Sequence, residues 1–166
     1  MSDFSPSGVA GSKRAVRGTI LAARRALPPA ERRRRDAAIA AALAPLVDGR
    51  AGVAGFAPVA GEPGGDELLG RLATADRLLL PVLLPDLDLD WADFDGTFRS
   101  GRFGLREPTG TRLGTGAVLG ISLLVVPAVA VTPRGLRLGR GGGSYDRVLA
   151  RVAGRVPALA VVDDEE

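Results

Sequence analysis

Residues 121–131 read Ile-Ser-Leu-Leu-Val-Val-Pro-Ala-Val-Ala-Val, a strongly apolar run that predicts a strand buried on both faces. Shorter apolar runs predict further strands at 53–57, 77–84 and 158–162, and helical spacing alternates with them at 66–73 and 144–152. Residues 85–116 are less regular, with short candidate strands around Trp91 and Phe103. Alternating strands and helices predict an α/β fold: a largely parallel sheet with helices on both faces, a Rossmann-like three-layer arrangement.

The N-terminal part of the chain predicts two helices. Residues 1–11 are small and polar and predict a disordered leader, which leaves residues 12–166 as one domain. Residues 13–27 and 30–46 have helical spacing on either side of a Pro-Pro break, so we expect a helical hairpin. The first helix should turn an apolar face inward, formed by Val16, Ile20, Ala23 and Leu27.

The chain contains no cysteine and no histidine, which excludes disulfides, Cys/His zinc sites, thiol nucleophiles and a Ser-His-Asp triad. Carboxylates, arginines, hydroxyls, backbone amides and the single lysine, Lys13, remain for chemistry. These groups suit phosphate binding with Mg²⁺ held by oxygen ligands. No apolar run reaches the roughly eighteen residues of a membrane span, and a secretory signal is lacking, so we expect a cytoplasmic protein.

Basic residues are concentrated near the N-terminus, although the net charge is only +3. Nine of them lie between Ser12 and Arg35, against the single acidic residue Glu31. Such a segment fits either a nucleic-acid-binding surface or a solvated arginine face on two helices. Aromatic residues make up only 4% of the chain and no RNA-binding motif is present, so we favour the solvated face and expect no nucleic-acid partner.

A glycine-rich segment follows the strongest predicted strand. It reads Arg137-Leu138-Gly139-Arg140-Gly141-Gly142-Gly143-Ser144-Tyr145-Asp146-Arg147 and opens a predicted helix. Glycine amides, arginines and a helix N-terminus together favour a polyphosphate, although a plain surface loop is the alternative. The segment is neither a Walker A loop, since Lys13 lies far away, nor a dinucleotide fingerprint, which needs glycine at position 144. Asp146 could hold Mg²⁺ or simply compensate the helix dipole.

The segment Val126-Pro127-Ala128-Val129-Ala130, followed by a turn and the glycine segment, resembles the VPGVAFD…RLGxGxGYYDR signature of 5-formyltetrahydrofolate cyclo-ligases. Three other segments agree in order and spacing with elements of that family: Lys13-Arg14-Ala15-Val16-Arg17, Gly61-Glu62-Pro63 and Phe103-Gly104-Leu105-Arg106-Glu107-Pro108. The resemblance runs from Lys13 to the last residue. The glycine-segment signature is highly specific, whereas the other segments are weak when taken alone.

The resemblance implies ATP-dependent cyclisation of 5-formyltetrahydrofolate to 5,10-methenyltetrahydrofolate, with Mg²⁺ present and release of ADP and phosphate, by a monomer. It implies that Arg140 and Lys13 are catalytic, that Asp146 binds Mg²⁺, and that Val59 and Glu62 contact the pterin side of the folate. The implied ATP-binding residues are Lys13, Arg14, Arg17, Arg137, Leu138, Gly139, Arg140, Gly141, Gly142, Gly143 and Tyr145. Taken alone, Lys13 and Arg17 would also fit a solvated helix face.

This sequence departs from the family pattern in three places. Ser144 stands where the family usually has a first tyrosine, and Gly64 stands where an acidic residue is common. The family also continues with a P-x-x-x-H-D segment and another strand after the position of Glu166, so we expect a truncated C-terminal region. A non-catalytic nucleotide- or folate-binding protein is therefore the second hypothesis, and an arginine-rich RNA-binding module is the third.

Overall fold

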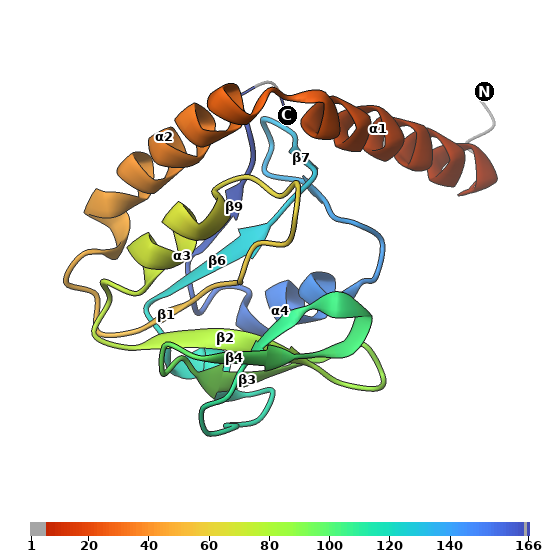
Figure 1. Ribbon diagram of the computed structural model, residues 1–166. Helices are drawn as coiled ribbons and strands as arrows, with labels where there is room; N and C mark the ends of the chain where they lie inside the picture. The colour runs from red at the N-terminus through yellow and green to blue at the C-terminus, as the bar shows by residue number, and fades with distance from the viewer. Residues whose placement is uncertain (1–5, 165) are drawn as a thin grey trace.

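The computed structural model describes residues 6–164 and residue 166 (Figure 1). In this part of the chain, the central sheet has five strands in the order β3-β2-β1-β6-β9. In chain order these strands are β1 (Val53–Ala54), β2 (Leu78–Leu83), β3 (Leu89–Asp93), β6 (Leu123–Pro127) and β9 (Ala158–Val161). All neighbours are parallel except β2 and β3, which are antiparallel. The prediction of a largely parallel sheet is confirmed.

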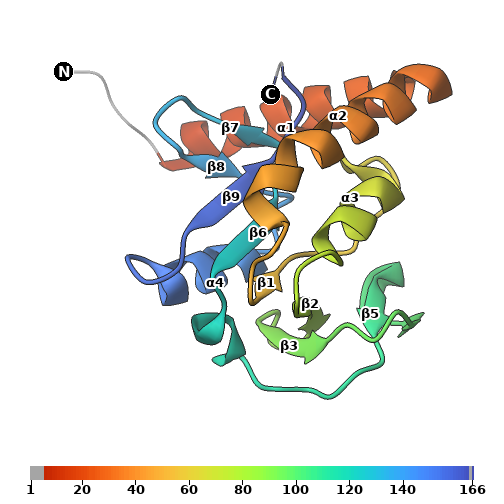
Figure 2. The ribbon, with the colours of Figure 1, turned by 90° about the vertical axis from the view of Figure 1, so that its left-hand side faces the viewer.

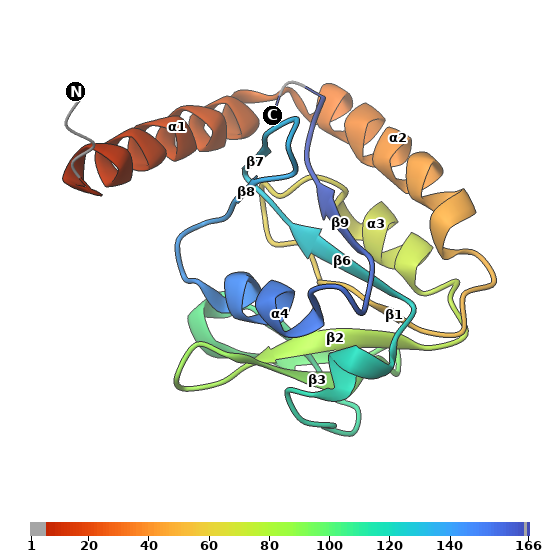
Figure 3. The same cartoon turned by 180° about the vertical axis from the view of Figure 1, so that it is seen from behind.

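Helices cover both faces of this sheet (Figures 1 and 3). Helices α2 (Pro29–Val47) and α3 (Gly65–Leu72) lie on one face, and α4 (Ser144–Val152) lies on the other. Alternate residues of β6 belong to two separate hydrophobic cores. Leu123 and Val125 pack with α2 and α3, whereas Leu124 and Val126 pack with α4. Both faces of β6 are therefore dry, which explains its unbroken apolar sequence and confirms the three-layer fold.

The apolar run at 121–131 does not form one strand as predicted. Strand β6 ends at Pro127, and β7 (Ala130–Val131) instead pairs antiparallel with β8 (Arg137–Leu138) in a small separate hairpin. Gly135, with φ of 78°, lies in the turn of this hairpin. The irregular region contains a second hairpin, β4 (Phe98–Ser100) with β5 (Arg106–Pro108), and two 3₁₀ turns, η1 (Arg102–Gly104) and η2 (Ala117–Gly120). Trp91 lies in β3 as predicted, whereas Phe103 lies in the turn between β4 and β5.

Helix α1 (Pro6–Ala26) corrects two predictions about the N-terminus. It begins inside the predicted disordered leader, of which residues 1–5 lie outside the described residues. It also diverges from α2 instead of packing against it as a hairpin (Figures 1 and 3). The extended backbone of Pro28, with φ −58° and ψ 146°, directs the two helices apart. As a result, α1 runs alongside the β7–β8 hairpin, as Figure 2 also shows.

The inward face of α1 also differs from the predicted one. Val16 is 47% exposed and Ala23 is exposed, whereas Arg24 is buried. The face that meets the protein is rotated toward Arg17, Ile20, Leu21, Arg24 and Leu27. An arginine can occupy such a position because main-chain carbonyls and a carboxylate accept its hydrogen bonds.

Strand β9 lies at the edge of the sheet. A groove of about 640 Å³ runs between it and α2, with Ile39, Leu43 and Leu159 among its lining residues. The expected continuation of the fold beyond this strand stays a prediction. Each helix within residues 6–164 and 166 is too short or too polar to form a membrane span.

Candidate functional site

The site lies where the direction of chain winding reverses. Helix α3 leads from β1 to β2 on one side, whereas α4 leads from β6 to β9 on the other side. Strands β1 and β6 are parallel neighbours, so the loops that leave their carboxyl ends diverge and leave a crevice. The loop after β1 carries Glu62, and the chain after β6 leads to the glycine segment. In open α/β sheets this is the usual place for a ligand.

The glycine loop, residues 139–143, connects β8 to α4. Gly141 has φ of 109° and Gly143 has φ of 74°, and Gly143 forms the N-cap of α4. These left-handed conformations favour glycine and leave the backbone amides uncovered by side chains. A Cβ atom at Gly141 would lie 3.8 Å from the guanidinium carbon of Arg17. The loop therefore brings free amides, a helix N-terminus and a cation together, which is the chemistry of a phosphate cradle.

Arg137 and Asp146 bridge the two ends of the glycine loop. A guanidinium nitrogen of Arg137 donates to Asp146 Oδ1 at 2.6 Å, and another donates to the carbonyl of Pro127 at 2.8 Å. The Arg137 side chain is only 10% exposed, whereas that of Asp146 is 70% exposed. Arg137 is thus occupied with holding Asp146 and β6, while Asp146 keeps an oxygen open to solvent.

The loop after β1 holds Glu62 in a defined position. Its carboxylate accepts a hydrogen bond from the Val59 backbone amide at 3.1 Å, and its side chain is only 9% exposed. On the far side of this loop, the backbone amide of Gly64 donates to Asp36 of α2 at 2.7 Å. Gly64 has φ of 95°, and a Cβ atom there would lie 2.7 Å from Leu68 Cβ, so this backbone requires glycine. The departure from the family pattern at position 64 therefore fits the local conformation.

An ion pair joins the two loops. Arg140 Nε lies 3.3 Å from Glu62 Oε1, and the Arg140 side chain is 47% exposed. Burial raises the pKa of the Glu62 carboxyl, while the Val59 amide, Arg140 and Arg24 act in the opposite direction. Burial raises the pKa of the Tyr145 hydroxyl, and the negative charge of the nearby Glu62 carboxylate raises it further. Its ring packs against both hydrophobic cores, which makes Tyr145 a support for the loop.

Helix α1 approaches the glycine loop from the outside. Arg17 Nε donates to the Gly139 carbonyl at 2.8 Å. Lys13, one turn earlier on the same helix, and Arg14 are exposed, so Lys13 can reach solvent beside the same loop. Leu138 is half-buried in β8, paired with Ala130. The structure thus groups Arg17, the glycine loop, Arg140 and Glu62, and leaves Lys13 and Arg14 on the surface.

No group of three acidic side chains in the described part of the chain is arranged to hold a metal ion. Asp146 is the one acidic residue in the first turn of α4, beside the glycine loop. A hard cation bound there would take its other oxygen ligands from phosphates and water, as Mg²⁺ usually does in nucleotide sites. The exposed carboxylate fits that arrangement.

Arg24 is a buried residue of this region that the sequence patterns did not single out. Its side chain is only 3% exposed, and its guanidinium donates to the carbonyls of the two residues that follow β6. The signal was present in the sequence, because Arg24 interrupts the apolar stripe of Ile20, Leu21 and Leu27 at helical spacing. An arginine in that stripe predicts either a different inward face or a buried charge with partners.

Comparison with known proteins agrees with this geometry. Residues 9–166 match the model of the 5-formyltetrahydrofolate cyclo-ligase family. A 5-formyltetrahydrofolate cyclo-ligase of Mycolicibacterium smegmatis is 39% identical over 163 residues, which cover 93% of this chain and 84% of the relative. The NMR structure of Aquifex aeolicus 5,10-methenyltetrahydrofolate synthetase aligns with a TM-score of 0.69 and 27% identity over 91% of this chain and 83% of that one.

A 5,10-methenyltetrahydrofolate synthetase from Mycoplasma pneumoniae shares the fold, with a TM-score of 0.69 and 22% identity over 89% of this chain and 83% of that one. The family match covers the N-terminal helix, the Glu62 loop and the glycine loop alike. This chain belongs to the 5-formyltetrahydrofolate cyclo-ligase family.

Proposed function

We propose that this protein cyclises 5-formyltetrahydrofolate to 5,10-methenyltetrahydrofolate, using ATP with Mg²⁺ and releasing ADP and phosphate. Family membership supports the reaction class. The observation that carries the proposal is the Arg140–Glu62 ion pair at 3.3 Å. It joins the loop suited to phosphate with the loop that the family resemblance assigns to the folate, so both substrates can meet at one point.

The glycine loop would bind the phosphates of ATP through its amides and the α4 N-terminus. Arg140 belongs to the loop and Arg17 donates to the Gly139 carbonyl, so both would neutralise charge as the γ-phosphoryl group moves from ADP to the formyl oxygen. N10 of the folate then attacks the formyl carbon and loses its proton to water, and the C–O bond breaks to release phosphate. Positioning and charge carry these steps, which suits a chain without histidine or cysteine.

Asp146 is the residue that would hold Mg²⁺, which when bound neutralises phosphate charge. Arg137 fixes the position of this carboxylate through its 2.6 Å hydrogen bond. Glu62 would hold the pterin side of the folate, with Val59 next to it in the same loop. Because Glu62 also pairs with Arg140, the folate and the phosphates would be held relative to each other.

We also propose that the protein acts as a cytoplasmic monomer without a nucleic-acid partner. Several arginines of the basic N-terminal segment are engaged within the protein. Arg17 and Arg24 donate to main-chain carbonyls, and Arg32 donates to the last carbonyls of α1. Arg34 is paired with Glu31. This engagement supports a structural use of the arginines over an RNA-binding surface.

Arg140→Ala is expected to weaken ATP binding by about 1–2 kcal/mol, near the scale of one charge-assisted hydrogen bond on a half-exposed side chain. Isothermal titration of the purified protein with Mg-ATP measures the change. Arg33→Ala, an exposed arginine on α2, is the control. Unchanged ATP affinity in Arg140→Ala would rule out the assignment of the loop to the nucleotide.

Lys13→Arg is expected to lower turnover and Lys13→Ala to lower it further, because a compact ammonium acts as a point charge that the planar guanidinium does not reproduce. Steady-state rates at saturating folate, with ATP varied, measure the effect. Arg25→Ala, an exposed arginine further along α1, separates a specific role of Lys13 from general surface charge. Parent-like rates in both Lys13 variants would make Lys13 a solvated helix residue.

A further inference from the structure

Helix α1 is attached to the rest of the protein by few side chains. Within residues 11–26, Arg24 is the one buried side chain, at 3% exposure. Arg17, two turns earlier on the same face, makes a further polar contact, because its Nε donates to the Gly139 carbonyl. A helix with so little apolar burial cannot owe its position to hydrophobic packing alone. We therefore expect these two arginines to contribute to its orientation.

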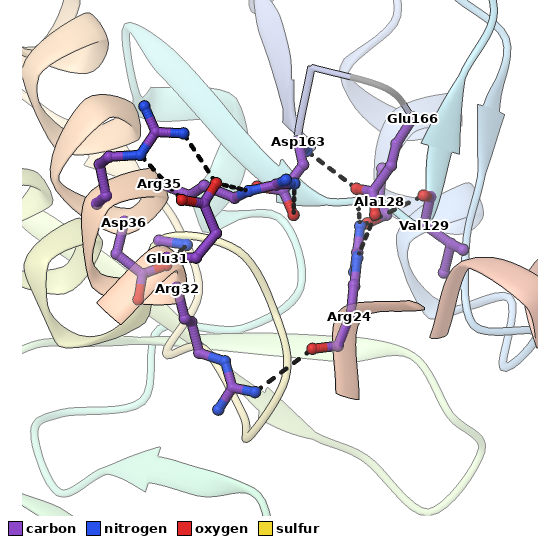
Figure 4. Close-up of polar contacts among 11 residues, drawn as sticks. Arg24, Glu31, Arg32, Arg35, Asp36, Ala128, Val129, Asp163 and Glu166 are labelled. Atoms are coloured by element: carbon purple, nitrogen blue, oxygen red, sulfur yellow. Dashed lines mark hydrogen bonds and ion pairs between the residues drawn. The ribbon is translucent and has the colours of Figure 1, made fainter. Parts of the chain in front are cut away.

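Arg24 makes a fork of hydrogen bonds at the carboxyl end of β6 (Figure 4). Its Nη2 donates to the carbonyls of Ala128 at 2.9 Å and Val129 at 3.3 Å. Its Nε and Nη2 also donate to the two carboxylate oxygens of Glu166, at 2.8 and 2.6 Å. Planar bidentate pairing of this kind fixes direction as well as distance.

The backbone that Arg24 holds leads directly into the proposed site. Ala128 and Val129 lie between β6 and the β7–β8 hairpin, and β8 ends at the glycine loop. Arg32 of α2 donates to the Arg24 carbonyl in the last turn of α1 and to the Leu27 carbonyl just after it, which links the two helices at their junction. The Arg24 guanidinium thus connects α1 to the segment between β6 and the β7–β8 hairpin, which leads to the glycine loop.

We propose that Arg24 is a positioning residue, which holds α1 so that Arg17 and Lys13 face the glycine loop. Arg24 also lies near the carboxylate of Glu62, in the loop that the family resemblance assigns to the folate. This inference rests on the proposed function for its consequence in catalysis. Arg24 does not touch the phosphates; it acts through the placement of α1.

Arg24 also reaches the folate side of the site. With Gly61 and Glu62 it lines a cavity of about 10 Å³, which Arg35, Asp36 and Asp163 also line. Its Nη1 is buried without a hydrogen-bond partner. Since Arg24 opposes the effect of burial on the Glu62 carboxyl, its positive charge helps keep Glu62 ionised. The charged groups that line the cavity with Glu62 also include Arg32 of α2, and Arg140 from the glycine loop and Tyr145 from α4 lie near the Glu62 carboxylate.

The two contributions of Arg24 can be separated by substitution. Arg24→Lys keeps a positive charge but loses the fork, whereas Arg24→Met loses both. We expect the KM for ATP to rise roughly tenfold in both variants, because α1 is no longer fixed. The acid limb of the pH–rate profile should move to higher pH only in Arg24→Met, since loss of a nearby cation raises the pKa of Glu62 further. Arg25→Met, exposed on the next position, is the control and should match the parent.

A distance measurement tests the placement of α1 without any activity. The chain has no cysteine, so spin labels can be attached at Gly18→Cys on α1 and Ala153→Cys after α4, both at exposed positions. The parent pair should give a narrow distance distribution by pulsed electron resonance, and Arg24→Met and Arg24→Lys should each broaden it. Circular dichroism confirms that the variants are folded, and Glu166→Gln provides a second, milder change to the same fork.

The outcomes distinguish the two proposals. A narrow, parent-like distribution in folded Arg24→Met would overturn the positioning role, whatever the kinetics. A parent that binds no ATP, combined with a broadened distribution in Arg24→Met, would refute the proposed function and leave the structural joint standing. We expect a broadened distance distribution and a raised KM for ATP in both Arg24 variants. We expect the acid limb of the pH–rate profile to shift in Arg24→Met alone.

Discussion

Glu62→Gln is expected to lower kcat/KM for 5-formyltetrahydrofolate by about 30- to 150-fold, equivalent to about 2–3 kcal/mol for the loss of a buried charged partner. Glutamine keeps the size of the side chain and can still accept the Val59 amide hydrogen bond. It cannot provide the negative charge that pairs with Arg140 across the two loops. The loss should therefore appear in turnover and folate binding.

The same substitution should stabilise the protein at neutral pH. Burial raises the pKa of Glu62 above its ordinary value of 4.5, so the folded state disfavours the charged form. The contribution of Glu62 to stability is fully present below the unfolded pKa and is lost as pH rises through the folded pKa. At pH 7 the parent therefore carries a penalty that Glu62→Gln lacks, and the difference in free energy of unfolding should shrink as pH falls toward 4.5.

Urea unfolding at several pH values, together with initial rates, measures both effects. Glu67→Gln, an exposed acid on α3, is the control and should change neither quantity. A variant that is less stable at pH 7, or one with parent-like kcat/KM, would contradict the account of Glu62 as a charge held at the site against the effect of burial.

Asp146→Asn is expected to weaken Mg²⁺ binding in the presence of ATP by roughly 100-fold or more. Loss of a group that only supports a metal ligand typically lowers affinity 10- to 100-fold, so loss of the ligand itself should exceed that range. The variant also removes the negative charge that pairs with the Arg137 guanidinium, although the asparagine oxygen can still accept its hydrogen bond. Titration with Mn²⁺ as a paramagnetic substitute, with ATP present, reports affinity without requiring turnover.

Asp76→Asn is the matched control, because its carboxylate is exposed and lies far from the glycine loop in the chain. It should leave Mn²⁺ affinity unchanged. If Asp146→Asn binds Mn²⁺ with ATP as tightly as the parent does, Asp146 serves only as a helix-dipole and Arg137 partner.

The layered fold was predictable because its signals are local and repeated. Leu123 to Val126 are apolar at every position, which indicates a strand covered on both faces, and the structure has helices there. The helix at 144–152 has the predicted bounds, since three glycines precede it and an amphipathic pattern follows. Strand β6 ends earlier than predicted because Ala130 and Val131 pair with β8 instead of continuing the central sheet. Apolar content alone does not show which strand a residue pairs with.

The arrangement of the N-terminal helices depended on long-range contacts. Spacing alone predicted Val16 and Ala23 on the inward face, yet hydrogen bonds from Arg17 and Arg24 to residues far along the chain set the rotation of α1. The same limit applied to the site. The sequence identified Glu62 and Arg140 separately, through resemblance, but it gave no sign that they form an ion pair.

One measurement tests the central claim most directly. The purified chain is incubated with 5-formyltetrahydrofolate, ATP and Mg²⁺, and the amounts of ADP and methenyl-folate that form are measured together. The product absorbs in the near ultraviolet, so methenyl-folate can be recorded directly, and ADP can be quantified in samples taken from the same reaction. We predict one ADP for each methenyl-folate, no product without ATP, and a loss of both in Glu62→Gln and Asp146→Asn. Binding of ATP and folate with no methenyl-folate formed would contradict the account and would make the chain a non-catalytic binding protein.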